Sequence, residues 1–213
     1  MGDCLRTDMK YQIISEATIQ PVTLTEARDH LRVVPFGYPS AHPDDTYIES
    51  AIAAARQWVE EYIERPLVSK TIEYYVSQFE QSFDLPTLPI QDVQSIKYLA
   101  DDNTIKTVAI DVYKLKTYSD SAKIILAYGK SFPTDVINEE NSITLTVTAG
   151  YTVGESPNTY PLPAPIKAAI LLIIGNLYEN RQQDVLGNTR ISFNSLPLGV
   201  YNILQPYRMG LGL

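Results

Sequence analysis

Residues whose types and spacing could support acid–base or metal chemistry are few in this sequence. His30 and His42 are its only histidines, and neither has a second histidine or cysteine at the spacing of a zinc site. Carboxylates adjacent in sequence do not face each other on a helix, and four such pairs occur: Asp44 with Asp45, Glu60 with Glu61, Asp101 with Asp102, and Glu139 with Glu140. Helix capping, a solvated helix face and a turn explain the first three pairs.

Sequence motifs of enzymes and of ligand-binding loops are also missing. We find no nucleophile elbow, no glycine-rich phosphate loop and no calcium loop. The run Gly129-Lys130-Ser131 resembles the end of a phosphate loop, but no glycine precedes it at the required spacing. We therefore expect no catalytic residue, no metal and no cofactor, and we expect that the protein is not an enzyme.

The composition narrows the class of protein. The 213 residues are 45% hydrophobic and 20% charged, which is typical of a globular protein with one large core or two smaller ones. The net charge of -8 argues against a surface that grips nucleic-acid phosphates, although an acidic wall could let DNA slide past. The single Cys4 excludes an intramolecular disulfide, and the N-terminal residues contain no apolar signal core, so we expect a cytoplasmic product.

The most apolar stretch is a helix that we predict over 163–183. Its apolar residues recur at spacings of three and four, and Leu171 and Leu172 extend the apolar face almost all the way round. Such a helix either lies at the centre of a core or is covered by another subunit, which makes Leu171, Leu172 and the nearby Arg181 candidate subunit-interface residues. The apolar run is shorter than the ~20 residues that a membrane span needs, so we expect no membrane partner.

Three further helices have start and stop signals. Thr23 and Glu26 have the spacing of a capping box, and the helix that follows is expected to end before Pro35. A second helix begins after Asp44 or Asp45 and ends before Pro66, with apolar residues at helical spacing. A short last helix is expected from 196 to 204, stopped by Pro206.

Between the second helix and the apolar helix, the apolar residues alternate. Alternation of this kind is typical of half-buried strands, and it predicts one antiparallel sheet over 70–151. The expected strands cover 71–76, 83–85, 93–99, 104–109, 113–118, 123–128 and 143–151. Fifteen tyrosines fit either strand and core positions or a surface where proteins meet.

These elements predict an α+β fold, with a helical bundle into which an antiparallel β domain is inserted. The bundle comprises 21–69 and 161–206, the inserted domain 70–151, and the segments 1–20 and 207–213 are expected to be extended arms. The two longest helices should share one core built from Ile52, Ala55, Val59, Ile63, Ile170, Ile173 and Leu177. The β domain should then be peripheral to that core.

The order of several short segments resembles the head–tail connector family of tailed phages, the head-completion adaptors that dock under the portal. The segments are PVTLTEARDHLRV (21–33), YIE with AARQWVEEY (47–62), LPTLPI (85–90), LYENR (177–181), and LPLGV with LQPYR (196–208). Together they cover nearly the whole chain. Residues before Met9 and the C-terminal segment have no counterpart in this pattern.

The resemblance implies a dodecameric ring between the portal protein and a stopper or tail-completion protein, within the virion and, during assembly, in the host cytoplasm. The ring would extend the DNA channel without binding DNA specifically and help to retain packaged DNA. In such a ring the C-terminal segment is our candidate for portal binding. On an extended chain Tyr207, Met209, Leu211 and Leu213 share one side, and Arg208 could pair with a carboxylate of the portal.

Two other classes of protein stay open on the sequence. One is an enzyme whose catalytic residues meet only in three dimensions, which would show a deep pocket with strongly shifted ionisable groups. The other is a carbohydrate-binding β domain that uses exposed rings on one strand face. Its candidate residues are Tyr74, Tyr75, Tyr113 and Tyr118.

Overall fold

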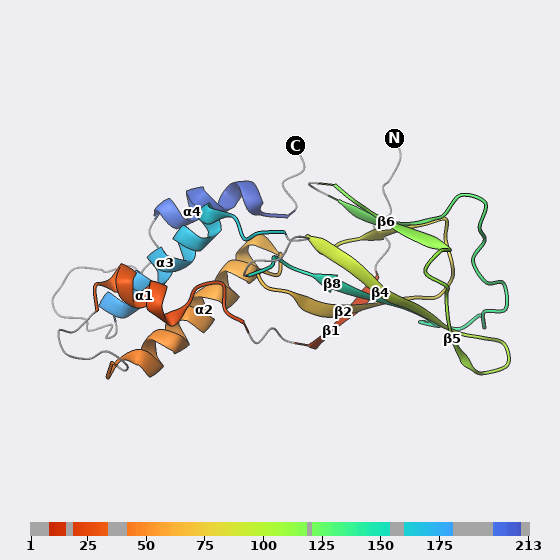
Figure 1. Ribbon diagram of the computed structural model, residues 1–213, viewed down its shortest axis with the longest axis horizontal. Helices are drawn as coiled ribbons and strands as arrows, with labels where there is room; N and C mark the ends of the chain where they lie inside the picture. The colour runs from red at the N-terminus through yellow and green to blue at the C-terminus, as the bar shows by residue number, and fades with distance from the viewer. Residues whose placement is uncertain are drawn as a thin grey trace, which may run out of the picture. The chain divides into compact units, whose positions relative to one another are not determined.

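The computed structural model describes residues 9–15, 19–33, 42–118, 121–153, 160–180 and 198–209. In these ranges the chain forms helices and antiparallel strands, so the fold is α+β as predicted (Figure 1). The described residues divide into two compact units. A β unit comprises those of 1–18, 68–152 and 156–160, and a helical unit comprises those of 19–67, 153–155 and 161–213. That residues 70–151 form a domain separate from the helical bundle of 21–69 and 161–206 stays a prediction.

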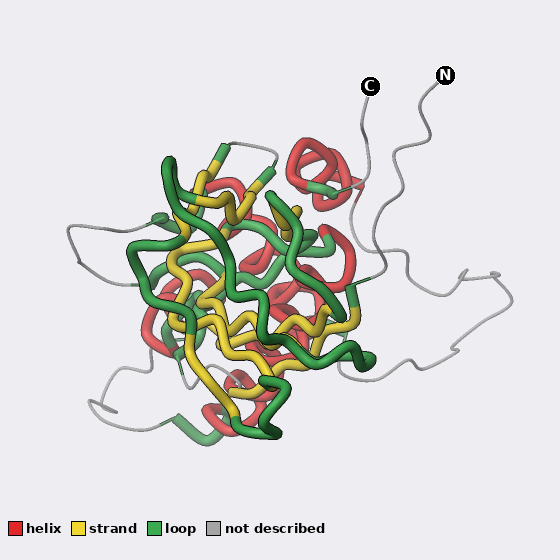
Figure 2. Tube along the Cα trace, turned by 90° about the vertical axis from the view of Figure 1, so that its right-hand side faces the viewer, coloured by secondary structure: helices red, strands yellow, loops and turns green. Residues whose placement is uncertain are grey.

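The larger sheet of the β unit has five strands in the order β1-β2-β8-β4-β5, and all neighbours are antiparallel. Their bounds are β1 Lys10–Ser15, β2 Lys70–Val76, β8 Ile143–Ala149, β4 Ile90–Leu99 and β5 Ile105–Thr107. Turns and loops, with no helix between them, join β2 through to β6. Figure 2 shows strands in yellow and the loops that join them in green. The expectation of an extended N-terminal arm was wrong for residues 10–15, which form the edge strand β1.

The other sheet has three strands in the order β3-β7-β6, with β3 at Ser82–Leu85, β7 at Ala122–Leu126 and β6 at Tyr113–Thr117. The sequence predicts these strands but places them in one sheet with the others, whereas the structure has two. The difference arises because alternation identifies a strand and its buried face but does not select its partner strand.

The core of the β unit is built from the inward faces of these strands. In the large sheet one row of paired residues crosses four strands, Tyr11, Tyr74, Leu145 and Ile96, and the last three are fully buried. Phe79 and Phe132 stack at 4.7 Å between ring centroids and cover Phe83 and Tyr98 edge-on. Aromatic pairs of this geometry contribute about 0.5–1.5 kcal/mol beyond their burial.

The helical unit contains α1 Leu24–Leu31, α2 Asp45–Ile63, α3 Ala164–Glu179, α4 Leu198–Leu204 and the 3-10 helix η1 Gln205–Tyr207. The capping box at the start of α1 is confirmed, since Thr23 Oγ1 accepts the Glu26 N–H at 3.2 Å and Glu26 Oε2 accepts the Thr23 N–H at 2.9 Å. The α2 helix ends at Ile63, before Pro66 as expected.

The helices share one core. The α2 helix packs against α3, α3 packs against α4, and α1 contacts both α2 and α3. The predicted core of the two longest helices is therefore confirmed, except that Leu177 is half-buried. The buried side chains are Ala27 of α1, Ile48, Ala51, Ile52, Ala55, Val59 and Ile63 of α2, Ile166, Ala169, Ile170, Ile173 and Ile174 of α3, and Val200 and Leu204 of α4.

Candidate functional site

The histidines that the sequence brings forward as candidates have structural surroundings. His42 Nδ1 accepts the Asp44 N–H at 3.1 Å, and the His42 N–H donates to Asp45 Oδ2 at 2.8 Å, so His42 belongs to the start of α2. The His30 ring lies beside Gly175, with its Nε2 3.7 Å from the point where a Cβ on that glycine would stand. Among the described residues no group of histidine, cysteine and carboxylate side chains is arranged to hold a metal ion.

Ion pairs fix α1 to its neighbours. Arg28 Nε donates to Asp45 Oδ1 at 2.7 Å, and the guanidinium makes a second bond to Asp45 Oδ2. The bond from Arg28 is the main cause that lowers the pKa of Asp45, and the backbone N–H of His42 adds to it. Lys167 of α3 pairs with Glu26, and this hydrogen bond is the main cause that lowers the pKa of Glu26.

Two tyrosines join the start of α2 to the end of α3. The Tyr47 hydroxyl donates to the Leu177 carbonyl at 2.6 Å, and the Tyr178 hydroxyl donates to Asp44 Oδ2 at 2.6 Å. Their ring centroids are 6.2 Å apart. This pair of reciprocal bonds holds the two longest helices in one register at this end of the unit.

Aromatic residues at the other end of α2 hold the C-terminal segment. Trp58 and Tyr62 stack at 5.2 Å, and the Tyr201 ring of α4 stands edge-on to both. The Arg208 guanidinium lies over the Tyr62 ring at 5.5 Å, within the range of a cation–π contact. We call Trp58, Tyr62, Tyr201 and Arg208 the aromatic clamp.

The aromatic clamp holds part of the candidate portal-binding segment, which the sequence predicts to be an extended arm. The sequence predicts that an extended arm begins at Tyr207, but Tyr207 ends the 3-10 helix and the Met209 N–H donates to the Ile63 carbonyl at 3.0 Å. Residues 207–209 are therefore part of the helical unit, because the clamp and this backbone bond hold them on the end of α2. Leu211 and Leu213 lie outside the described residues.

The sequence does not single out the aromatic clamp, although one local signal was present. Trp58 and Tyr62 are four residues apart, so they must be neighbours on the surface of α2. The contribution of Tyr201 and Arg208 depends on the packing of α4 and could not be read from spacing. The clamp joins side chains from α2, α4 and the residue after η1.

The candidate subunit-interface residues differ in exposure. Leu172 is 38% exposed on α3, whereas Leu171 is half-buried and the next two isoleucines are buried. Arg181 lies outside the described residues. Among the described residues of this set, Leu172 is therefore the one whose apolar side chain is exposed.

Apolar side chains are also exposed on two parts of the β unit. On β1, Tyr11, Ile13 and Ile14 are 59%, 41% and 50% exposed, on a strand whose outer edge has no partner strand in the described chain. Around β5 and the following loop, Ile105 and Ile110 are 75% and 77% exposed. Exposed apolar groups beside an open sheet edge are typical of surfaces that contact another protein.

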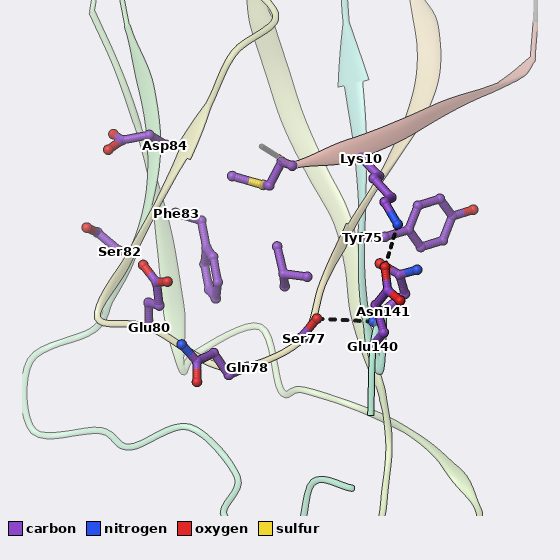
Figure 3. Close-up of a pocket in the computed structure, with 12 residues that line it drawn as sticks. Lys10, Tyr75, Ser77, Gln78, Glu80, Ser82, Phe83, Asp84, Glu140 and Asn141 are labelled. Atoms are coloured by element: carbon purple, nitrogen blue, oxygen red, sulfur yellow. Dashed lines mark hydrogen bonds and ion pairs between the residues drawn. The ribbon is translucent and has the colours of Figure 1, made fainter. Parts of the chain in front are cut away.

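A hollow of about 250 Å³ opens beside β1 and contains charged side chains (Figure 3). Lys10 forms an ion pair with Glu140 on one side, while Glu80, Ser82 and Asp84 line the other (Figure 3). Lys10 lowers the pKa of Glu140 through this bond. The carboxylates are exposed, so the hollow lacks the enclosed, strongly shifted groups that an active site requires.

The tyrosines proposed for carbohydrate binding do not form an exposed row. Tyr74 and Tyr113 are 0% and 6% exposed, Tyr75 is half-buried, and Tyr118 alone of the four is exposed. Burial raises the pKa of Tyr74 to about 12. The carbohydrate-binding hypothesis was therefore wrong about these residues, because the inward positions of β2 and β6 belong to the core.

None of the helices that the structure describes combines the length and the apolar content that a bilayer-spanning helix needs.

Comparisons with known proteins identify the fold through solved structures. No family model matches the chain, and no curated protein sequence matches it. The chain is similar to a chain in the neck of an empty gene transfer agent (GTA) particle computed with C6 symmetry, at 21% identity and a TM-score of 0.71. The match covers 96% of this chain and 98% of the other.

Two further solved structures have the same fold. A chain in the virion of a native GTA particle matches with a TM-score of 0.69 and 21% identity. A chain in the neck of a native GTA particle computed with C12 symmetry matches with a TM-score of 0.64 and 20% identity. Each match again covers 96% of this chain and 98% of the other.

Proposed function

We propose that this protein is a structural component of the neck of a tailed phage or phage-like particle. The observation that carries the proposal is the agreement in fold with neck proteins over both units of the chain. Agreement over 96% of the chain includes the insertion of strands between the helices, which a shared helical bundle alone would not reproduce.

Within that role we propose the adaptor position, as a ring of twelve copies under the portal. The C6 and C12 symmetries of the similar necks support a cyclic assembly. The ring would extend the DNA channel, let DNA pass without specific contacts, and present its far side to a stopper or tail-completion protein. The net charge of -8 supports a channel along which DNA slides.

The proposed portal contact is the C-terminal segment. The aromatic clamp holds Tyr207, Arg208 and Met209 on the end of α2, so the chain beyond starts from a fixed point. A fixed starting point lowers the ordering cost of docking, since fewer residues lose conformational freedom. Leu211 and Leu213 would supply the apolar contacts to the portal.

The exposed Leu172, with Leu171 and Arg181, is proposed as part of the contact between neighbouring copies. A ring of this kind needs a contact that excludes water at its centre, and an apolar side chain on a rigid helix can supply it. The α3 helix is rigid here because its opposite face is buried against α2 and α4.

Negative-stain imaging of the purified protein, alone and mixed with its portal, tests the proposed function. We expect twelve-fold rings stacked on portal rings in the mixture. A monomeric protein that fails to join portal particles under conditions where they stay intact would contradict the adaptor assignment.

A further inference from the structure

The outer face of the three-stranded sheet carries a group of lysines. In the register of β6 and β7, Lys116 stands opposite Lys123, and Lys114 stands opposite Ile125. The alternate residues Ile124, Ala122 and Tyr113 are buried, so successive side chains point to opposite faces and the lysines face away from the core. We call Lys114, Lys116 and Lys123 the lysine face.

Within the described chain, few carboxylates neutralise the positive charge of the lysine face. Lys123 forms an ion pair with Asp84 of β3 at 2.9 Å. No carboxylate of the described residues lies within ion-pair distance of Lys114 or Lys116, which are both exposed. Like charges directly opposite each other on neighbouring strands are destabilising. An acidic surface placed against this face would relieve that repulsion.

The C-terminal end of α2 has the opposite charge. Glu61 and Glu64 are exposed there, and the last turn of the helix contains no basic residue. The carbonyl end of a helix is itself negative, so carboxylates at this end are unfavourable. Glu61 accepts a hydrogen bond from Gln57 at 3.1 Å. We call Glu61 and Glu64 the acidic helix end.

Cations of the same unit compensate the acidic helix end only in part. Arg65 follows Glu64 in sequence and is half-buried. The Arg208 guanidinium lies over the Tyr62 ring at 5.5 Å. No described residue forms an ion pair with Glu61 or Glu64.

We propose that the lysine face of one copy docks on the acidic helix end of a second copy. The inference rests on the proposed ring, because a cyclic head-to-tail assembly needs two different surfaces that complement each other on every copy. Charge is complementary between these two surfaces.

A second copy fits the lysine face better than nucleic acid does. Affinity for DNA rises with the number of phosphates that lysine and arginine neutralise, whereas this face supplies Lys114, Lys116 and Lys123, with Asp84 beside the last. The chain as a whole has a net charge of -8, which repels a polyanion but gives any second copy a mainly acidic surface. Charge complementarity therefore favours contact between copies.

Two charge-reversal variants of the full chain test the contact. One carries Lys114→Glu and Lys116→Glu, and the other carries Glu61→Lys and Glu64→Lys. Sedimentation velocity at low ionic strength should show self-association of the wild type. Each variant alone should associate on the order of tenfold more weakly, since exposed ion pairs between the copies become repulsions. Salt should weaken the wild-type association as well.

The mixture of the two variants is the decisive sample. At equal concentrations they should associate again, because the reversed, acidic lysine face of one variant meets the reversed, basic helix end of the other, and the two unchanged surfaces also match. Recovery of this kind requires contact between different chains. Matched controls with Lys97→Glu and Glu139→Lys, two exposed sites outside both surfaces, should associate as the wild type does.

Several outcomes would overturn the contact. They are variants that associate as the wild type does, a mixture that does not recover, and a wild type that stays monomeric up to about 1 mM at low salt. Loss of duplex-DNA binding with unchanged self-association would assign the lysine face to nucleic acid instead. Portal binding in the same samples separates this contact from the proposed adaptor position. If both variants still form rings on the portal as the wild type does, the contact between the lysine face and the acidic helix end is contradicted, but the adaptor position is not. If the mixed variants regain self-association but no sample binds the portal, the adaptor position is contradicted, but the contact is not.

Discussion

Gly150 follows β8 at a point where the backbone of Val68 leaves no room for a side chain. Its φ is 113°, and a Cβ at this position would stand 2.1 Å from the Val68 carbonyl oxygen. Its own N–H donates to the Pro89 carbonyl at 2.8 Å and its carbonyl accepts from Gln91 Nε2 at 2.7 Å. The backbone therefore cannot move away without breaking both bonds.

We predict that Gly150→Ala lowers the free energy of unfolding. Backbone strain alone contributes about 1–3 kcal/mol, and the collision with Val68 adds to it. Urea denaturation followed by circular dichroism measures the change. As a control, Gly199→Ala has nothing within 4 Å of the new Cβ and lies in the first turn of α4, so it should not lower the free energy of unfolding. Equal effects of the two substitutions would contradict the prediction.

The Arg28–Asp45 pair makes a pH-dependent contribution to stability. Hydrogen bonding to Arg28 lowers the pKa of Asp45 in the folded chain, relative to about 3.9 for an unfolded aspartate. A carboxyl with a lowered pKa stabilises the fold above its unfolded value, and that stabilisation is lost as the pH falls toward the folded pKa.

We therefore predict that Asp45→Asn is most destabilising at neutral pH. The difference from the wild type should shrink as the pH falls below about 4, because the unfolded chain then binds a proton at Asp45 while the lowered pKa in the folded chain resists it. Urea denaturation at several pH values gives the comparison. Glu139→Gln, at an exposed turn, is the matched control. A difference between Asp45→Asn and the wild type that stays constant from pH 7 to pH 3 would argue against the ion pair as its source.

At the scale of elements, the sequence predicts those features that depend on nearby residues and misses those that depend on pairing between distant segments. The helices follow local signals, such as the capping box at Thr23 and the proline that ends α2. The partner of β1 does not, because Tyr11 pairs with Tyr74 of a strand far along the chain. The aromatic clamp likewise needs α4 to be placed before Tyr201 can meet Trp58.

The core between α2 and α3 allows a test of how these two helices pack. Ile173 is 2% exposed and Leu172, its neighbour on α3, is 38% exposed. We predict that Ile173→Ala lowers the free energy of unfolding by about 2–5 kcal/mol, the range for a large aliphatic side chain removed from a packed core. Leu172→Ala should cost far less, since little buried volume is lost. Similar costs in urea denaturation would mean that α3 is not packed as described.

For the whole molecule, the sequence predicts the fold class and the order of the elements better than it predicts which residues are exposed on the surface. Surface function depends on which groups the folded chain leaves uncovered. Ile105 stands between the polar Thr104 and Lys106 as a core residue of a strand does, yet it is mostly exposed. The lysine face follows from the register of β6 with β7, which no residue spacing in one strand can reveal.

The C-terminal segment gives the prediction for the assembled protein, and two truncations separate its two roles. Truncation after Gln205 removes Arg208 and Met209, which contact Tyr62 and the Ile63 carbonyl. We expect this truncation to lower the free energy of unfolding by about 1–3 kcal/mol, because a cation–π contact and a backbone hydrogen bond are lost. Truncation after Met209 keeps both contacts and should leave stability unchanged.

Portal binding should respond differently from stability. We predict that truncation after Met209 abolishes co-sedimentation with portal particles, because in the proposed function the apolar residues beyond Met209 would supply the contact and the aromatic clamp would only fix its starting point. Arg208→Ala in the full-length chain is the matched control: it weakens the clamp, keeps those residues, and should reduce portal binding only in part, since ordering the segment then costs more. Wild-type portal binding by the chain that ends at Met209 would place the portal contact on another surface of the protein.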